Sequence, residues 1–156
     1  MAFSDFVLKE AILPNMQATT AEDALRELVQ AIVATGSLDA SEVDATVERI
    51  LEREATGSTA LGGGAATPHD RNSSVSKVVT AIGISANGVP FNALDNRPVK
   101  LFFLTLTPHT LANEPYFQVM RYIAKSLRDQ EFTRYMMQLS EISDVLELLE
   151  EQDGKN

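Results

Sequence analysis

The residue best suited to chemistry in this sequence is a histidine that follows a glycine-rich segment. Residues 57–68 read GSTALGGGAATP and lead directly into His69. A neutral imidazole nitrogen is a good nucleophile toward a phosphoryl group. Hydroxyls, backbone N–H groups and arginines stabilise the charge of that group while it is transferred. Side chains of these types near His69 in the sequence are Arg53, Ser58, Thr59 and Arg71. The pattern favours the conversion of His69 to phosphohistidine.

Other chemistries fit these residues less well. The two histidines, His69 and His109, and the neighbouring Asp70 lack a metal-ligand spacing such as HExxH, so we expect no metal site. The glycine segment lacks the Gly-Lys-Ser/Thr ending of a nucleotide phosphate loop, and we expect no cofactor. A serine hydrolase needs a GxSxG elbow, which is missing. A lone histidine in a loop is more often an ordinary surface residue, and from residue types alone that alternative stays open.

An α/β framework must position these residues. Apolar side chains recur at helical spacing after Thr20, a predicted helix cap, and again after Asp39. The apolar runs at 77–86 and 99–107 predict two strands buried on both faces, with a turn signal at Asn87-Gly88. Both histidines then fall in loops beside strands.

The remaining elements complete one domain. A weaker strand signal lies at residues 6–8, and three further helices are predicted from Asn113, near 131–139 and near 143–151. This order predicts a single α/β domain over residues 1–153, with one mixed β-sheet flanked by helices, and a frayed tail at 154–156.

Composition narrows the function classes. The 156 residues include 13 Lys and Arg against 22 Asp and Glu, a net charge of −9, which disfavours a nucleic-acid binder. No apolar run approaches the roughly 18 residues that span a membrane, and the N-terminus is not a secretory signal, so we expect a cytoplasmic protein without membrane insertion. The lack of cysteine excludes disulfides and a cysteine nucleophile. Residues 61–128, with 7 Lys and Arg against 3 Asp and Glu, are the net-positive part of the chain.

Three blocks of the sequence resemble one known family. Residues 53–69, REATGSTALGGGAATPH, resemble without gaps the phosphorylation-site signature of type-2 EIIA domains of the bacterial phosphotransferase system. These are the EIIA domains of the fructose/mannitol and nitrogen-branch class. Residues 88–99, GVPFNALDNRPV, and 101–108, LFFLTLTP, are similar to the segment and strand that follow in that family. The resemblance covers nearly the whole chain.

The resemblance implies a fold and a role. The fold is an αβα sandwich with a mixed sheet. The role is that of a phosphoryl carrier: the histidine at the position of His69 accepts the group from an HPr-type phosphohistidine carrier. It then passes the group to a cysteine of an EIIB-type domain, or its phosphorylation state regulates another protein. By position, Arg53 neighbours the phosphate and Ser58 and Thr59 lie in the loop that lines it. Without an attached EIIB-like segment, we expect the nitrogen-type regulatory branch. No oligomeric state is implied.

Several positions depart from the family pattern; among them, Ala60 and Gly63 replace the more usual glycine and asparagine. Tyr116 stands where the family usually has a second histidine, and His109 lies seven residues earlier. A tyrosine donates a hydrogen bond but carries no positive charge. Asp70 replaces a usually small residue, and its carboxylate would repel a phosphohistidine if it faced the ring. The alternative function is therefore a regulatory or binding module of the same fold without efficient phosphotransfer. An Asp70 side chain that points away from the ring, with Arg53 near the ring, favours the carrier.

Overall fold

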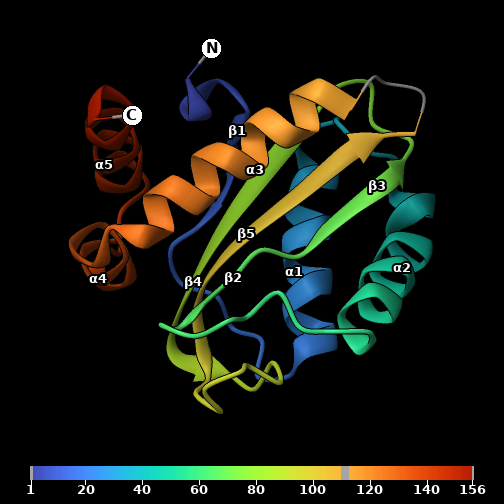
Figure 1. The fold of residues 1–156 in the computed structure, drawn as a ribbon. Helices are drawn as coiled ribbons and strands as arrows, with labels where there is room; N and C mark the ends of the chain where they lie inside the picture. The colour runs from blue at the N-terminus through green and yellow to red at the C-terminus, as the bar shows by residue number, and fades with distance from the viewer. Residues whose placement is uncertain (1, 110–112, 156) are drawn as a thin grey trace.

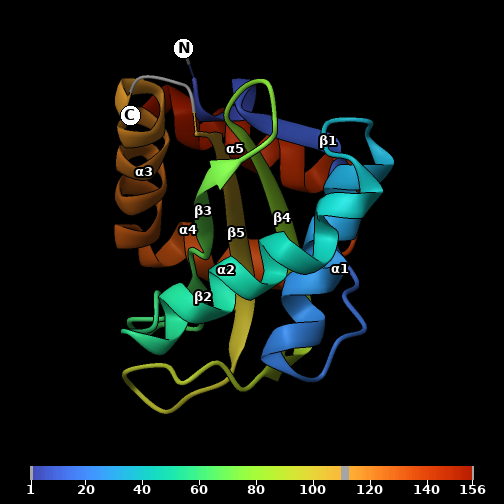
Figure 2. The ribbon, with the colours of Figure 1, turned by 90° about the vertical axis from the view of Figure 1, so that its right-hand side faces the viewer.

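A mixed β-sheet lies between two layers of helices in the computed structural model, which describes residues 2–109 and 113–155 (Figure 1). Its strands are β1 (Val7–Leu13), β2 (Ala65–Ala66), β3 (His69–Ser73), β4 (Val79–Val89) and β5 (Val99–Pro108). The helices are α1 (Ala21–Ala34), α2 (Val43–Ala55), α3 (Asn113–Arg128), α4 (Gln130–Gln138) and α5 (Ile142–Lys155). Figure 2 shows α1 and α2 on one side of the sheet and α3, α4 and α5 on the other. The predicted α/β fold is confirmed.

Strand pairing determines where His69 lies. β4 and β5 pair antiparallel, and β1 pairs parallel with β4 on the far side. β2 and β3 both pair parallel with β5, one after the other along its length. Ala65 lies opposite Leu101, and His69 lies opposite Thr105. The segment that carries His69 therefore forms the sheet edge remote from β1.

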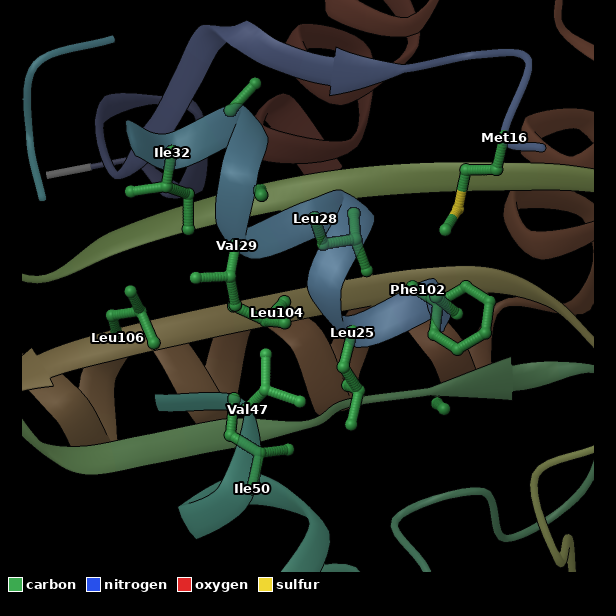
Figure 3. Packing of buried hydrophobic residues seen from close by; sticks show 14 of the residues in the cluster. Met16, Leu25, Leu28, Val29, Ile32, Val47, Ile50, Phe102, Leu104 and Leu106 are labelled. Carbon is green, nitrogen blue, oxygen red and sulfur yellow. The ribbon is translucent and has the colours of Figure 1, made fainter. Parts of the chain in front are cut away.

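The side chains of β5 alternate between two hydrophobic layers, as the pleat of a strand requires. Phe102, Leu104 and Leu106 pack with α1 and α2 in one layer (Figure 3). Leu101 and Phe103 pack with α3, α4 and α5 in the other. All five are fully buried, and each contributes about 1.5–3 kcal/mol through removal of its apolar surface from water. The strand that begins with His69 therefore pairs with a strand whose side chains are buried on both faces.

Most predicted elements are confirmed with shifted ends. Thr20 Oγ1 accepts the Asp23 N–H at 3.2 Å, so α1 begins with the predicted cap. The strand signal at residues 6–8 extends to Leu13 because pairing with β4 orders the rest of the segment. α5 includes Gly154 and Lys155, which the sequence assigns to a tail, and Asn156 lies outside the described residues. Among the described helices, none is long and apolar enough to cross a membrane.

Two local predictions are wrong. His69 does not lie in a loop but begins β3, whose sequence HDRNS has no apolar alternation; backbone hydrogen bonds to β5 order this strand instead. The Asn87-Gly88 turn does not end β4, which continues to Val89 through an irregularity in its pairing with β5. Gly88 adopts a φ of +81°, and its N–H donates to Ser85 Oγ at 3.1 Å, so the positive φ occurs at a bulge.

We predict that Gly83→Ala destabilises the protein. A Cβ on Gly83 would collide with Met16 Sδ and lie 2.9 Å from Leu28 Cδ2, where α1 packs on β4. Overpacking of this kind costs about 1–3 kcal/mol of the free energy of unfolding, measurable by urea denaturation. Met16→Ala removes the first of these obstacles. The cost of Gly83→Ala should therefore be smaller in the Met16→Ala background, and equal costs in both backgrounds would contradict the packing argument.

Candidate functional site

β5 holds the backbone on both sides of the candidate histidine. Pro68 precedes His69, and its carbonyl oxygen accepts the Thr105 N–H at 3.1 Å. His69 itself pairs in register with Thr105. The Thr105 hydroxyl is buried and shares a 3.0 Å hydrogen bond with Thr80 on the next strand. His69 is therefore attached to the most deeply buried part of the sheet, while its half-buried side chain remains accessible.

A single hydrogen bond determines which ring nitrogen of His69 can react. Nδ1 lies 3.0 Å from the carbonyl oxygen of Thr67. A carbonyl oxygen only accepts, so Nδ1 carries the proton and donates. In the neutral ring the lone pair then lies on Nε2. The local geometry thus prepares Nε2 as the nucleophile.

The residue that orients this ring is itself tied to helix α2. The Thr67 N–H donates to Thr59 Oγ1 at 3.2 Å. Thr59 donates in turn to both carboxylate oxygens of Glu54, from its hydroxyl at 2.7 Å and from its N–H at 2.8 Å. A continuous series of hydrogen bonds therefore runs from Glu54 through Thr59 and Thr67 to His69. Glu54 lies within the signature block, but no role for it follows from the sequence, because its partner becomes clear only when the loop folds back.

Tyr116, at the family's second-histidine position, lies beside His69. The two ring centroids are 5.7 Å apart, and Tyr116 is 8% exposed. The guanidinium carbon of Arg71 lies 4.2 Å from the Tyr116 centroid, a cation–π contact. Because strand residues two apart share a face, His69 and Arg71 both face α3. The structure thus brings together three groups from β3 and the start of α3.

Asp70 points to the opposite side of the sheet. Its Oδ2 accepts from Arg49 Nε at 3.0 Å and from Arg49 Nη2 at 2.9 Å, and its side chain is 4% exposed against 34% for Arg49. The other oxygen, Oδ1, accepts the Asn72 N–H at 3.0 Å. The carboxylate is thus directed toward α2 and neutralised there, away from the His69 ring. Arg49 is four residues before Arg53, one helical turn away on the same face of α2, which is the sequence signal for this partner.

A surface cavity of about 640 Å³ lies next to Asp70, between α2 and the ends of β3 and β5. Arg53, Arg71 and His109 line it. Arg53 Nη1 donates to the Gly57 carbonyl oxygen at 2.7 Å, and His109 Nδ1 lies 3.2 Å from the Ser73 carbonyl oxygen. Among the described residues, the ring of Tyr116 contacts the His69 ring, and His109 makes no ring contact with it. The two arginines and the imidazole share this cavity with the carboxylates of Glu52 and Asp70.

Two hydroxyls make contacts that their sequence positions do not reveal. Ser58 Oγ donates to the Phe91 carbonyl oxygen at 2.9 Å and accepts the Ala60 N–H at 3.0 Å, so it holds the loop against the β4–β5 connection. Thr107, which the sequence marks only as a strand residue, lines the 640 Å³ cavity. Its buried Oγ1 has no hydrogen-bond partner among residues 2–109 and 113–155.

Within those residues, no cluster of three or more His, Asp or Glu side chains could hold a metal ion.

Comparison with known proteins confirms the resemblance found in the sequence. Residues 5–152 match the family model for the EIIA 2 component of the phosphoenolpyruvate-dependent sugar phosphotransferase system. The chain is similar to a fructose-specific EIIA component from Haloferax volcanii, 31% identical over 132 residues, which cover 85% of this chain and 84% of that one. It is also similar to a nitrogen regulatory protein from Bradyrhizobium diazoefficiens, 32% identical over 134 residues, or 86% of this chain and 85% of that one.

Solved structures have the same fold. The nitrogen regulatory protein IIA-Ntr from Neisseria meningitidis superposes with a TM-score of 0.81 at 26% identity, covering 94% of this chain and 97% of the other. Mannitol-specific enzyme IIA from Escherichia coli, solved in complex with phosphorylated enzyme IIB, superposes with a TM-score of 0.71 at 23% identity, covering 91% and 95%.

The Arg49–Asp70 pair predicts an asymmetry between two substitutions. Arg49→Met leaves a buried carboxylate without its counter-charge, whereas Asp70→Asn leaves a guanidinium that water already reaches. We expect Arg49→Met to lower the free energy of unfolding by about 2–3 kcal/mol, less than a fully buried pair would lose, and Asp70→Asn to cost less. Urea denaturation measures both. Arg121→Met breaks an exposed pair with Glu114 and serves as the control, expected within about 1 kcal/mol of the parent. Equal losses in all three variants would refute the assignment.

Proposed function

This chain belongs to the EIIA 2 family of the phosphoenolpyruvate-dependent sugar phosphotransferase system, and we propose that it carries a phosphoryl group on Nε2 of His69. The observation that carries the proposal is the Nδ1–Thr67 hydrogen bond, because it leaves the Nε2 lone pair ready for attack. The ring is half-buried, and Arg71 contacts the Tyr116 ring that lies beside it. A phosphoryl-carrier role is the one that family membership supports.

The proposed transfer conserves atoms and charge. Nε2 of His69 attacks the phosphorus of a phosphohistidine on an HPr-type carrier. The new N–P bond forms as the donor's N–P bond breaks, and the donor imidazole keeps the electron pair. The proton stays on Nδ1, which continues to donate to the Thr67 carbonyl oxygen, and this acceptor stabilises the positive charge that the His69 ring gains. In the second transfer, a cysteine thiolate of an EIIB-type partner attacks the same phosphorus and His69 Nε2 leaves.

The groups that would stabilise the phosphoryl oxygens come from both sides of β3. We assign Arg53 to this role, and Arg71 is a second cation on the same cavity. Ser58 and Thr59 act by shaping the loop, since each hydroxyl has protein partners.

The chain's relatives support a regulatory use of the same chemistry. The chain is similar both to a fructose-specific EIIA component and to nitrogen regulatory proteins. We propose the nitrogen-type branch, in which the phosphorylation state of His69 regulates a protein partner, with the cytoplasm as its compartment. A module without phosphotransfer is less well supported, because Asp70, the residue that would repel the phosphoryl group, is paired with Arg49 on the opposite side of the sheet.

The central experiment is labelling by a phosphorylated HPr-type carrier. The parent protein should gain one acid-labile phosphoryl group, and His69→Ala should gain none because the nucleophile is gone. Lys9→Gln is the control and should be labelled like the parent, since Lys9 is exposed on β1, at the sheet edge remote from His69. Label that survives in His69→Ala would disprove the acceptor assignment. A parent protein that accepts no label would support the module without phosphotransfer.

Thr59 offers a test of the hydrogen-bond series. Thr59→Val removes the hydroxyl that joins Glu54 to Thr67, so the Thr67 carbonyl loses its fixed position and the His69 ring its orientation. We expect phosphorylation about tenfold to a hundredfold slower, since small misplacements of a nucleophile have effects of that size. Thr59→Ser keeps the hydroxyl and should recover most of the rate. The ¹⁵N chemical shifts of His69 report the tautomer, and a Val variant with unchanged shifts and rate would exclude the positioning role.

A further inference from the structure

A second and larger cavity opens on the α3 side of the molecule. Its volume is about 1010 Å³, and it lies between the 59–67 segment and helices α3 and α4. Apolar side chains from both helices form much of its lining: Met120, Ile123, Ala124, Leu127 and Met137. None of these residues takes part in the proposed phosphoryl transfer. The cavity therefore requires an explanation of its own.

The charge of this cavity differs from that of the whole protein. Lys100, Arg128 and Arg134 line it, and no Asp or Glu is among the described residues that do so. All three cations are exposed, and no carboxylate within residues 2–109 and 113–155 pairs with any of them. The chain as a whole has a net charge of −9. An apolar pocket bordered by three cations that no described carboxylate neutralises is complementary to a ligand with an anionic head and an apolar body.

We propose that this cavity binds a small amphiphilic anion, such as a medium-chain carboxylate. Small-molecule pockets typically enclose about 300–1,000 Å³ and combine apolar walls with a few polar groups, and this cavity is at the upper end of that range. The apolar body lies along α3 and α4, and the head group lies among Lys100, Arg128 and Arg134. The inference does not depend on phosphoryl transfer.

The cavity shares two residues with the series that orients His69. Thr59 and Thr67 line it, and both hold the His69 ring through the hydrogen bonds described above. A bound anion therefore contacts the wall that positions the nucleophile. Occupancy should be detectable at His69, whereas His109 lines the other cavity and should not respond.

Calorimetric titration with decanoate, below the concentration at which it forms micelles, tests the proposal. We expect saturable binding with one decanoate per chain. Replacement of both arginines, Arg128→Gln with Arg134→Gln, should weaken binding about tenfold because the head group loses charged donors. Ala124→Phe should weaken binding by placing a bulky side chain on the apolar wall of the cavity. Lys125→Gln is the matched charge control: it lies on α3, is exposed, does not line the cavity and should bind like the parent.

Two further measurements test the proposal: the affinity for a cationic amphiphile and the NMR signals of the two histidines. Decyltrimethylammonium, with the same chain and the opposite charge, should bind at least tenfold more weakly. In NMR spectra, decanoate should shift the imidazole signals of His69 and leave those of His109 in place. Equal affinity for the cationic and anionic amphiphiles, or binding that Ala124→Phe leaves intact, would overturn the proposal. So would the absence of decanoate binding to the parent protein.

Discussion

The parallel pairing of β3 with β5 is the constraint on which the candidate site depends. It gives His69 and Asp70 opposite faces of one sheet, because adjacent residues of a strand must point in opposite directions. The imidazole then meets α3, and the carboxylate meets α2. In a loop, the same two neighbours could share one side, and the negative charge would oppose a phosphoryl group on the ring. The short strand thus separates an incompatible pair of side chains without changing either residue.

Two acidic residues, Glu54 and Asp70, hold the segment of His69 in place through hydrogen bonds. Glu54 accepts two hydrogen bonds from Thr59, and Asp70 accepts two from Arg49. Both carboxylates thus join α2 to the segment that bears His69, one before the histidine in the chain and one after it. Each is satisfied by donors at hydrogen-bond distance, which a part-buried carboxylate requires. The net charge of the chain consequently says little about the field at the ring, which depends on how each charge is paired.

The sequence predicts the framework well because its strongest signals are local. The apolar runs of β4 and β5, the Thr20 cap and the helical spacing of α1 and α2 all act within a few residues. The sequence does not predict β3, because hydrogen bonds to β5 order that strand. The residue of β5 that pairs with His69 is Thr105, which lies 36 residues later in the chain. For the same reason, the block around His69 identifies the candidate nucleophile but not its partners. Arg49 and Glu54 acquire their roles only when α2 folds against the segment that follows it.

The tyrosine at the second-histidine position can be understood from its neighbours. Tyr116 carries no positive charge, so by itself it removes a cation from the place where the family usually has one. Arg71, however, lies over the Tyr116 ring at 4.2 Å, and that ring lies 5.7 Å from His69, centroid to centroid. A positive charge is therefore present beside the two rings, supplied by β3 rather than by α3. A guanidinium stays protonated throughout the physiological pH range, whereas an imidazole loses its charge near neutrality. The Tyr116 ring provides the surface on which the guanidinium is held.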